Sequence, residues 1–221
     1  MNGTVLAHPV NPELIGVNRY MEKDAIGTYF IQNLMDAAIN ETGFTRYTYI
    51  NPVNNNRIEE KLGYVRMVNG EYWLGSGLYG GPVENNSPSA ISTLLENITE
   101  LMKFTEEARE FAIQEGEEMA LSEFSKPDGE FVSENNYISA YDLSGTNLAH
   151  PFHPEFIGHN RLSSPDLDGL LYVSKMTEIA SERGKGFLVY TWEEPVTGEV
   201  KSKLAYLIRI DDWFILSGLY L

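Results

Sequence analysis

The sequence predicts an α+β protein made of two similar units, each with an antiparallel sheet, joined by a long α-helix. The first reason is an internal repeat: GTVLAHPVNPELIGVNR at positions 3–19 matches GTNLAHPFHPEFIGHNR at positions 145–161 in 12 of 17 places. The second is that each copy of this string is followed by the pattern of one helix and three strands. The third is a helical pattern without proline that fills most of the segment between the copies.

The N-terminal part of each copy predicts a short strand, a loop and a helix. The strands are expected over residues 4–8 and 146–150, and each runs into a loop rich in proline and glycine. Apolar residues then recur at helical spacing, and Asp24 and Asp166 are suited to cap these helices at their N-termini. A glycine that can follow a helix in the left-handed conformation closes each segment, at Gly43 and Gly184.

Three strands are expected after each helix, because apolar and polar residues alternate in stretches rich in aromatic and β-branched side chains. They are predicted over 44–50, 61–68 and 71–79 in the first copy, and over 187–193, 202–210 and 212–220 in the second. Short turns at Asn69-Gly70 and Asp211-Asp212 favour antiparallel pairing of the strands beside them. This order of elements excludes a doubly wound nucleotide-binding fold.

The segment between the copies predicts one helix over residues 88–124, in which Gly116 is a weak point. A strand at 137–142 and a hairpin turn then lead into the second copy. The predicted domains are a first unit at 1–82, which lacks an N-terminal helix and first strand, and a complete second unit at 83–221, with its sheet domain at 137–221. Either the chain is a fragment of a longer protein or the first unit borrows its missing strand; because an unpaired edge strand is a liability, we expect a fragment.

Composition excludes several classes of function. The chain has 32 acidic and 16 basic residues and a formal charge of −16, whereas a nucleic-acid-binding protein needs a basic face. It has no cysteine, which excludes disulfides, thiolate catalysis and cysteine metal sites. No apolar run approaches the length of a membrane span and no signal peptide is visible, so we expect no membrane insertion by this chain.

Motifs for catalysis and cofactor binding fail on inspection. GSGLYG at 75–80 fits the dinucleotide-binding pattern, but no helix follows it. The histidines near position 150 are of a residue type that binds zinc, yet the first copy offers only His8, so the repeat requires no metal. The sequence contains no nucleophile elbow and no zinc-protease motif. We therefore predict a protein that is not an enzyme and that carries neither a metal nor a cofactor.

Several motifs occur in a fixed order in the second copy: GTNLAHP, PEFIGHN, DLDG, GFLVYTW, KLAY and SGLY. In these motifs the chain resembles the Cache domain family, in its single-Cache type 2 form, and positions 2–80 repeat the pattern without its N-terminal part. The resemblance implies a PAS-like antiparallel sheet flanked by helices, with a small-molecule pocket on one face. It also implies an extracytoplasmic sensor domain of a chemoreceptor or histidine kinase, whose ligands are short carboxylates.

A pocket for a small carboxylate needs a few cationic and hydroxyl donors in a sheltered wall. The repeat places such residues, and aromatic residues beside them, at matching positions in both copies. We predict the following ligand-binding residues: His8, Arg19, Tyr47, Tyr49, Lys61, Tyr64, Tyr79, His150, Arg161, Tyr190, Trp192, Lys203, Tyr206 and Tyr220.

Each of these residues also has a purely structural interpretation. The histidines can bond the backbone of their own loop, the arginines can brace it, the lysines can protect a strand edge, and the aromatic pairs can form core. The leading hypothesis is a sensor module that recognises short organic acids or related metabolites. The alternative is a structural or dimerisation module with filled pockets, in which the long helix forms a homodimer.

Overall fold

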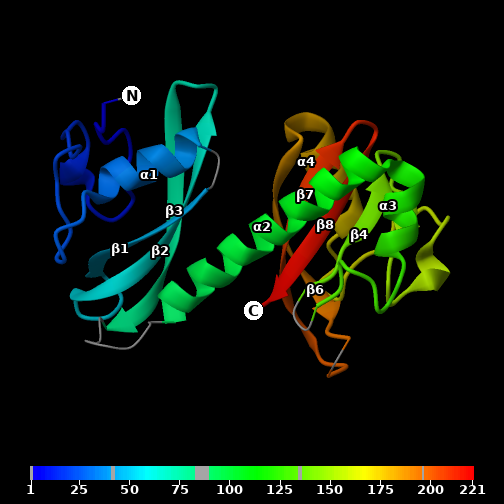
Figure 1. Cartoon of the computed structure of the whole chain (residues 1–221). Coiled ribbons are helices and arrows are strands. Elements are labelled where there is room, and N and C mark those ends of the chain that lie inside the picture. Colours follow the sequence, from blue (N-terminus) through cyan, green and yellow to red (C-terminus); the bar gives the residue numbers. More distant parts are fainter. Residues whose placement is uncertain (1, 41–42, 83–89, 134–135, 196) are drawn as a thin grey trace. The chain divides into compact units, whose positions relative to one another are not determined.

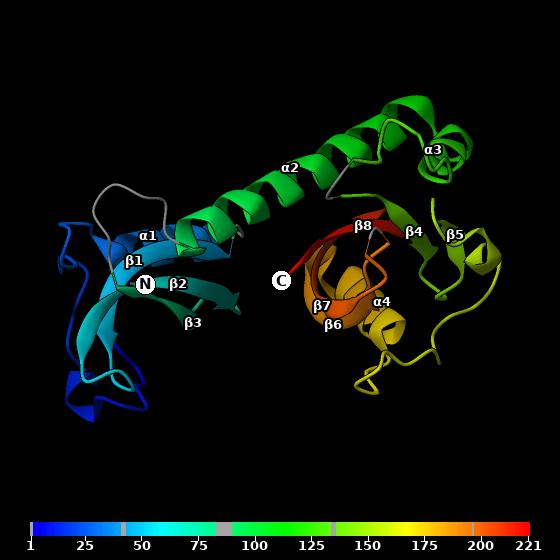
Figure 2. The same ribbon diagram turned by 90° about the horizontal axis from the view of Figure 1, so that it is seen from below.

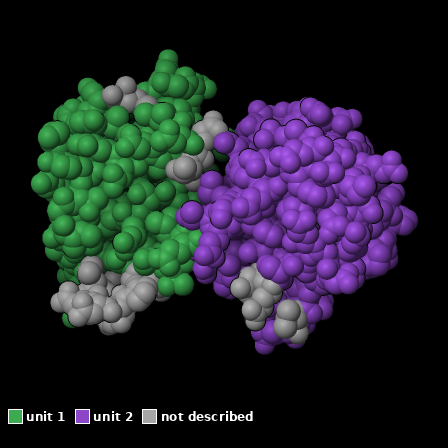
Figure 3. All heavy atoms as spheres, in the orientation of Figure 1, with its two compact units in different colours: residues 1–96 green, residues 97–221 purple. Residues whose placement is uncertain are grey.

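The computed structural model describes residues 2–40, 43–82, 90–133, 136–195 and 197–221 (Figure 1). The chain forms two compact units, Met1–Glu96 and Asn97–Leu221, which Figure 3 distinguishes by colour; they are called unit 1 and unit 2 below. The predicted division between residues 82 and 83 stays a prediction, because residues 83–89 lie outside the described part of the chain.

The described part of unit 1 has a helix packed on a three-stranded antiparallel sheet. Helix α1 spans Phe30–Ile39, and strands β1 (Phe44–Asn51), β2 (Arg57–Val68) and β3 (Tyr72–Pro82) pair in the order β1-β2-β3. The turn between β2 and β3 lies at Asn69-Gly70, whose φ angles of 50° and 72° suit the tight hairpin that the sequence predicts.

The core of unit 1 lies between α1 and one face of the sheet. Phe30 and Leu34 of α1 are 3% and 5% exposed, and they pack in one cluster with Tyr47 of β1 and Val65 of β2. The rings of Phe30 and Tyr47 stack with their centroids 5.1 Å apart. Burying a side chain of this size stabilises the fold by about 1.5–3 kcal/mol, so the packing decides which residues of β1 point inward.

The segment that was predicted as one helix over 88–124 contains two helices. Helix α2 spans Ala90–Glu115 and helix α3 spans Glu117–Phe124, while residues 88–89 lie outside the described part. Gly116 separates them with a φ of 86°, a left-handed conformation that interrupts a right-handed helix and that glycine adopts without steric cost. The boundary between unit 1 and unit 2 falls within α2.

Unit 2 has a five-stranded antiparallel sheet in the order β5-β4-β8-β7-β6. Its strands are β4 (Ser139–Asp142), β5 (Asn147–Ala149), β6 (Lys185–Glu193), β7 (Val200–Ile210) and β8 (Trp213–Tyr220). Helix α4 spans Tyr172–Arg183 and ends at Gly184, which takes the predicted left-handed conformation with a φ of 74°. The Pro-rich loops of the two units contain matching 3-10 turns, Pro12–Leu14 and Pro154–Phe156.

Helix α4 packs on one face of the unit 2 sheet, and α2 and α3 pack on the other (Figure 2). Successive residues of β7 therefore meet different helices: Ala205 packs with α4, whereas Tyr206 packs with Leu101 of α2. Strands buried on both faces are apolar almost throughout. Lys203, which shares the α4 face with Ala205, is therefore an unusual residue for this strand.

The two predicted strands at 4–8 and 146–150 differ in outcome. Residues Asn147–Ala149 form β5, which pairs with β4. In unit 1 the prediction is wrong, because Thr4 makes only an isolated bridge with Asn18. The physical reason is the neighbouring strand: in the described residues of unit 1, no strand takes the place that β4 has in unit 2.

Asp24 and Asp166 do not cap helices, so that prediction is also wrong; α1 and α4 begin six residues after them. Each carboxylate instead accepts a backbone N–H from the first strand after the helix. Asp24 Oδ2 accepts from Thr48 of β1 at 2.9 Å, and Asp166 Oδ2 accepts from Thr191 of β6 at 2.9 Å. The two aspartates thus tie the Pro-rich loop to the sheet.

Candidate functional site

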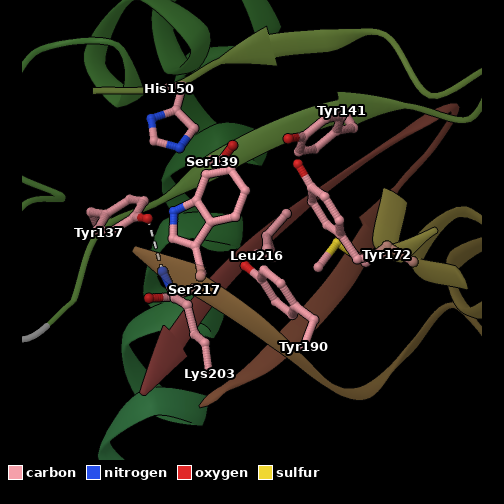
Figure 4. A pocket seen from close by; sticks show the side chains of 11 residues that line it. Tyr137, Ser139, Tyr141, His150, Tyr172, Tyr190, Lys203, Leu216 and Ser217 are labelled. Atoms are coloured by element: carbon pink, nitrogen blue, oxygen red, sulfur yellow. Dashed lines mark hydrogen bonds between the residues drawn. The ribbon is translucent and has the colours of Figure 1, made fainter. Parts of the chain in front are cut away.

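A small cavity lies in unit 2 between the sheet and α4 (Figure 4). It is lined by Tyr137, Ser139, Tyr141, His150, Tyr172, Met176, Tyr190, Trp192, Lys203, Leu216 and Ser217. The space open to the centre of a water molecule is about 10 Å³, roughly what a single water requires. None of these lining residues is acidic, so the wall offers mainly hydrogen-bond donors and apolar surface.

Strand alternation brings the lining side chains to one face. Ser139 and Tyr141 are two residues apart on β4, and Tyr190 and Trp192 are two residues apart on β6, so each pair points the same way. Gly218 of β8 leaves space for the lysine of β7, since a Cβ at this position would lie 2.3 Å from the Cε atom of Lys203.

Lys203 places a buried cation in the cavity wall. The residue is 2% exposed, and its Nζ donates a hydrogen bond to the hydroxyl of Tyr137 at 2.8 Å and lies 3.4 Å from that of Tyr220. Nζ also lies 4.0 Å from the ring centroid of Tyr137. Among the described residues, no carboxylate forms an ion pair with Lys203, and burial lowers the pKa of its ammonium group to about 7.

His150 presents a neutral donor to the same space. Its Nδ1 accepts two backbone N–H groups, from Phe152 at 3.2 Å and from His153 at 3.1 Å. A nitrogen that accepts carries no proton, so the hydrogen of the neutral ring is on Nε2. Burial, followed by the nearby positive charges, lowers the pKa of His150 to about 2. In Figure 4 the ring projects toward the cavity that it lines.

Three further polar atoms are buried in this region without a hydrogen-bond partner among the described residues. They are the indole Nε1 of Trp192, the hydroxyl of Ser217 and Nε of Arg161. Arg161 is outside the lining, where its Nη2 donates to the Tyr172 hydroxyl at 3.1 Å and its guanidinium lies 3.8 Å from the ring centroid of Phe156. The unit 2 site therefore holds more donors than the protein itself satisfies.

Unit 1 brings five predicted residues together in a more open arrangement. Arg19 donates from Nη1 to the hydroxyl of Tyr49 at 3.1 Å, and the rings of Tyr47 and Tyr49 lie 6.1 Å apart. Lys61 Nζ lies 3.4 Å from the hydroxyl of Tyr79, and burial lowers the pKa of this lysine. Lys61 is only half-buried, in contrast to its counterpart Lys203.

His8 keeps the loop hydrogen bonds of its counterpart but not the surroundings. Its Nδ1 accepts backbone N–H groups from Val10 at 3.3 Å and from Asn11 at 2.9 Å. His150 stands 5.3 Å from the ring of Tyr137, a residue just before β4, and unit 1 has no such strand in its described part. Both histidines thus accept hydrogen bonds from the backbone of their own loop, and among the described residues His150 also lines the unit 2 cavity.

Tyr64 and Tyr206 do not belong to either site, which corrects the prediction. Each is three residues after a lysine on the same strand, and an odd spacing turns side chains to opposite faces. Tyr206 is 1% exposed and packs with Leu101 on the α2 side of the sheet. Tyr64 packs with the ring of Phe44 at 4.8 Å. Tyr220 reaches the site indirectly, through its contact with Lys203.

The sequence prediction missed most of the cavity wall: Tyr137, Ser139, Tyr141, Tyr172, Met176, Leu216 and Ser217. The first three could have been found from their alternation along the predicted strand at 137–142. Tyr172 and Met176 are one helical turn apart, a spacing that places both on one face of α4. Nothing local distinguishes Leu216 and Ser217 from other core positions of β8.

A family model described as a Cache domain matches residues 1–221. The chain belongs to the Cache domain family. Cache domains are sensor modules of receptors and kinases, so the resemblance seen in the sequence motifs is confirmed. An 89-residue stretch, 39% of this Cache chain, is 33% identical to the sensor histidine kinase MctS of Rhizobium johnstonii (strain DSM 114642 / LMG 32736 / 3841) and covers 19% of that kinase.

Two solved structures resemble part of this Cache chain. A methyl-accepting chemotaxis protein from Vibrio parahaemolyticus RIMD 2210633 matches with a TM-score of 0.51 and 22% identity, over 58% of this chain and 90% of the other. A Cache chemosensory domain, described for its carboxylic acid recognition, matches with a TM-score of 0.50 and 21% identity, over 60% and 98%. At this identity the likeness establishes a mixed α/β fold with antiparallel sheets.

Membrane-spanning helices and metal-binding clusters are both absent from the described residues of this Cache chain. No helix there has both the length and the apolar character that crossing a membrane requires. No group of three or more histidine or acidic residues there is arranged to hold a metal ion.

Proposed function

We propose that this Cache chain is a noncatalytic sensor module and that the unit 2 cavity binds a short organic acid as its carboxylate. The observation that carries the proposal is a buried cavity with unsatisfied donors and no acidic residue in its lining. A buried donor without an acceptor costs about 1–3 kcal/mol. A carboxylate offers several lone pairs and a negative charge, so one ligand satisfies several of these donors.

In the proposed complex, the carboxylate oxygens accept hydrogen bonds from Lys203 Nζ and His150 Nε2. The Trp192 indole and the Ser217 hydroxyl are the neighbouring buried donors that complete the site. Charge-assisted bonds of this kind are about twice as strong as neutral ones. The apolar lining around Met176 would receive the carbon chain. Because the cavity is small, acids of two to four carbons are the expected class, and their entry requires lining side chains to move.

Strand β7 connects the cavity to helix α2, so a change at the ligand can alter the packing of that helix. Lys203 faces the cavity, and Tyr206 on the same strand faces Leu101 of α2. A ligand that draws the strands together would therefore change the packing of α2, the element proposed to join two PAS-like units in tandem. The family membership and the solved domain described for carboxylic acid recognition support this proposal. Family membership also supports an extracytoplasmic location for the chain.

The alternative is a structural module whose pockets are filled by side chains and whose α2 helix forms a homodimer. The small size of the cavity favours this alternative. The two proposals differ in a measurable way, because only a ligand-binding module is stabilised by a dissolved acid through mass action.

The test is isothermal titration calorimetry and thermal unfolding of the full chain with acetate, propionate, lactate and pyruvate, at constant ionic strength. Binding by at least one acid, with a rise in Tm and with loss of both effects in Lys203→Met, is the expected result. The proposal is overturned when all four acids leave the Tm and the calorimetric baseline unchanged. Analytical ultracentrifugation with and without acid tests the dimer of the alternative.

A further inference from the structure

The Arg19 side chain of unit 1 already holds a carboxylate, which belongs to the protein itself. Its Nε and Nη2 atoms both donate to Glu22, each at 2.5 Å, so the pair is bidentate. Planar guanidinium and carboxylate groups match best in this geometry. This ion pair lowers the pKa of the Glu22 carboxyl and raises that of Arg19, so both groups are charged at neutral pH.

Arg19 is held as a rigid receptor. The residue is 7% exposed, and its guanidinium lies 5.2 Å from the ring centroid of Phe30 and 5.5 Å from that of Tyr49. Its remaining terminal nitrogen, Nη1, donates to the Tyr49 hydroxyl at 3.1 Å. Only the edge that faces Glu22 is thus directed at an acid. Glu22 itself has a side chain that is 44% exposed, so the acid occupies the solvent side of the pair.

The same place in unit 2 has no acid. Glu22 and Ser164 are equivalent, since each follows its arginine by three residues and donates its backbone N–H to that arginine's carbonyl at 3.0 Å. Arg161 is partly buried, and its Nε atom is buried without a hydrogen-bond partner among the described residues. The Arg161 charge contributes, after several hydrogen bonds, to the lowered pKa of the exposed Glu155. At this loop position the two units therefore differ by one carboxylate.

We infer that unit 1 contains a carboxylate-binding site on Arg19 that Glu22 occupies as a tethered ligand, so that the chain binds dissolved carboxylate in unit 2 alone. A tethered group competes at an effective concentration in the millimolar range or above, which excludes a weak dissolved acid. Removing the Glu22 carboxylate opens the site to small monocarboxylates. This inference rests on the proposed function for its statement about unit 2, and its statement about unit 1 is independent.

The test uses calorimetry on the full chain with acetate, propionate and pyruvate. The variants are Glu22→Ser, which copies unit 2, Lys203→Met, and the two combined; Glu71→Ala removes an exposed unit 1 acid as a control. We expect one site in the wild type and in Glu71→Ala, two in Glu22→Ser, none in Lys203→Met, and one millimolar site in the double variant. Circular dichroism and Tm confirm folding, and Glu22→Ala replaces Glu22→Ser if that variant unfolds.

The outcomes separate this inference from the proposed function. A wild type that binds nothing, with a Glu22→Ser variant that binds one acid, overturns the unit 2 proposal and supports the unit 1 site. A wild type that binds one acid, with a double variant that binds none while folded, overturns the unit 1 site alone. Two sites in the wild type also overturn it, because Glu22 would then not compete.

Discussion

The two units carry the same loop motif, yet their sites differ in closure and in charge. Lys203 is 2% exposed with a pKa of about 7, whereas Lys61 is half-buried. Arg161 has a serine beside it where Arg19 has Glu22. A repeated motif therefore specifies the sequence positions of the hydrogen-bond donors. The helices and strands packed around them decide whether those donors are buried, and neighbouring residues decide whether they are already paired.

Strand β4 is the element that makes most of this difference. In unit 2 it covers the edge of β8, and its N-terminal neighbour Tyr137 supplies the hydroxyl that Lys203 bonds. The sheet of unit 1 ends at β3 in the described part of the chain. The residue of β3 that corresponds to Ile215, Leu74, is 63% exposed, while Ile215 is fully buried. Ile215 packs with α2 and α3, so these helices cover the sheet face behind the cavity, while β4 covers the sheet edge.

Replacing each lysine in turn tests most directly whether carboxylate binding belongs to unit 2. Lys203→Met should weaken carboxylate binding by about 2–5 kcal/mol, which is at least about 30-fold in Kd, because a desolvated charge partner is lost. Lys61→Met should leave the Kd within about twofold. Calorimetry with the acid that the wild type binds gives both numbers. Equal losses in the two variants would contradict the assignment of binding to unit 2.

The pH dependence of binding should be the next largest effect. His150 is neutral because its pKa is about 2, and burial raises the pKa values of Tyr137 and Tyr190, so Lys203 is the cavity-lining group that changes charge near neutrality. Its ammonium form binds the anion, so the Kd should rise about tenfold per pH unit above pH 7. Calorimetry at pH 8 in buffers of different protonation enthalpy should report nearly one proton taken up per ligand.

The stability of the free protein should change in the opposite direction over the same range. The folded-state pKa of Lys203 is below its ordinary 10.5, so between pH 7 and 10.5 the unfolded chain binds more protons than the native state. The free energy of unfolding should therefore rise with pH in this window. Lys203→Met should remove most of this rise, whereas Lys61→Met should remove only the smaller part that follows from the lowered pKa of Lys61. Urea titrations at pH 6.5 and 9 measure the difference.

A transplanted acid should make unit 2 behave more like unit 1. Ser164→Glu places a carboxylate three residues after Arg161, where it can pair with that guanidinium and repel an incoming anion. We expect a weakening of about 1 kcal/mol, which is about fivefold in Kd. Ser164→Gln is the uncharged control. A Ser164→Glu protein that binds with wild-type affinity would separate Arg161 from ligand recognition.

The smallest effect should come from the Glu22 ion pair as a contribution to stability. The Glu22 side chain of this pair is exposed to solvent, so the ion pair is weak. Glu22→Gln should therefore lower the free energy of unfolding by no more than about 1 kcal/mol. Because the pairing lowers the carboxyl pKa in the folded state, its contribution is present above the ordinary pKa of glutamate and is lost as the pH falls through the lowered value. Urea unfolding followed from pH 7 into the acid range should therefore show the full difference from wild type at pH 7 and a decreasing difference as the carboxyl becomes protonated.

Much of the fold could be predicted because its patterns are local. Alternation over residues 202–210 gave β7 to within two residues, and Gly184 ended α4 as expected. Predictions that depended on a distant partner were less successful. The segment at 4–8 has the same pattern as β5 but lacks a strand to pair with, and Asp24 has the sequence context of a cap but bonds to β1.

The same distinction applies to the candidate site. His150, Tyr190, Trp192 and Lys203 were predicted from residue type and repetition, and all four line the cavity. Tyr206 was misplaced because its spacing from Lys203 was treated as proximity, although a strand turns odd neighbours to opposite faces.

The sequence by itself determined the repeat, the family, the order of helices and strands, and the chemical character of the donors, because these follow from residue type and short-range spacing. Tertiary structure alone decided which copy buries its donors. Tyr137 and Lys203 are 66 positions apart, and their hydrogen bond exists only because β4 lies beside β8 and β8 beside β7. Burial, and with it the pKa of Lys203 and the absence of an acid from the lining of its cavity, depends on neighbours that no local pattern specifies.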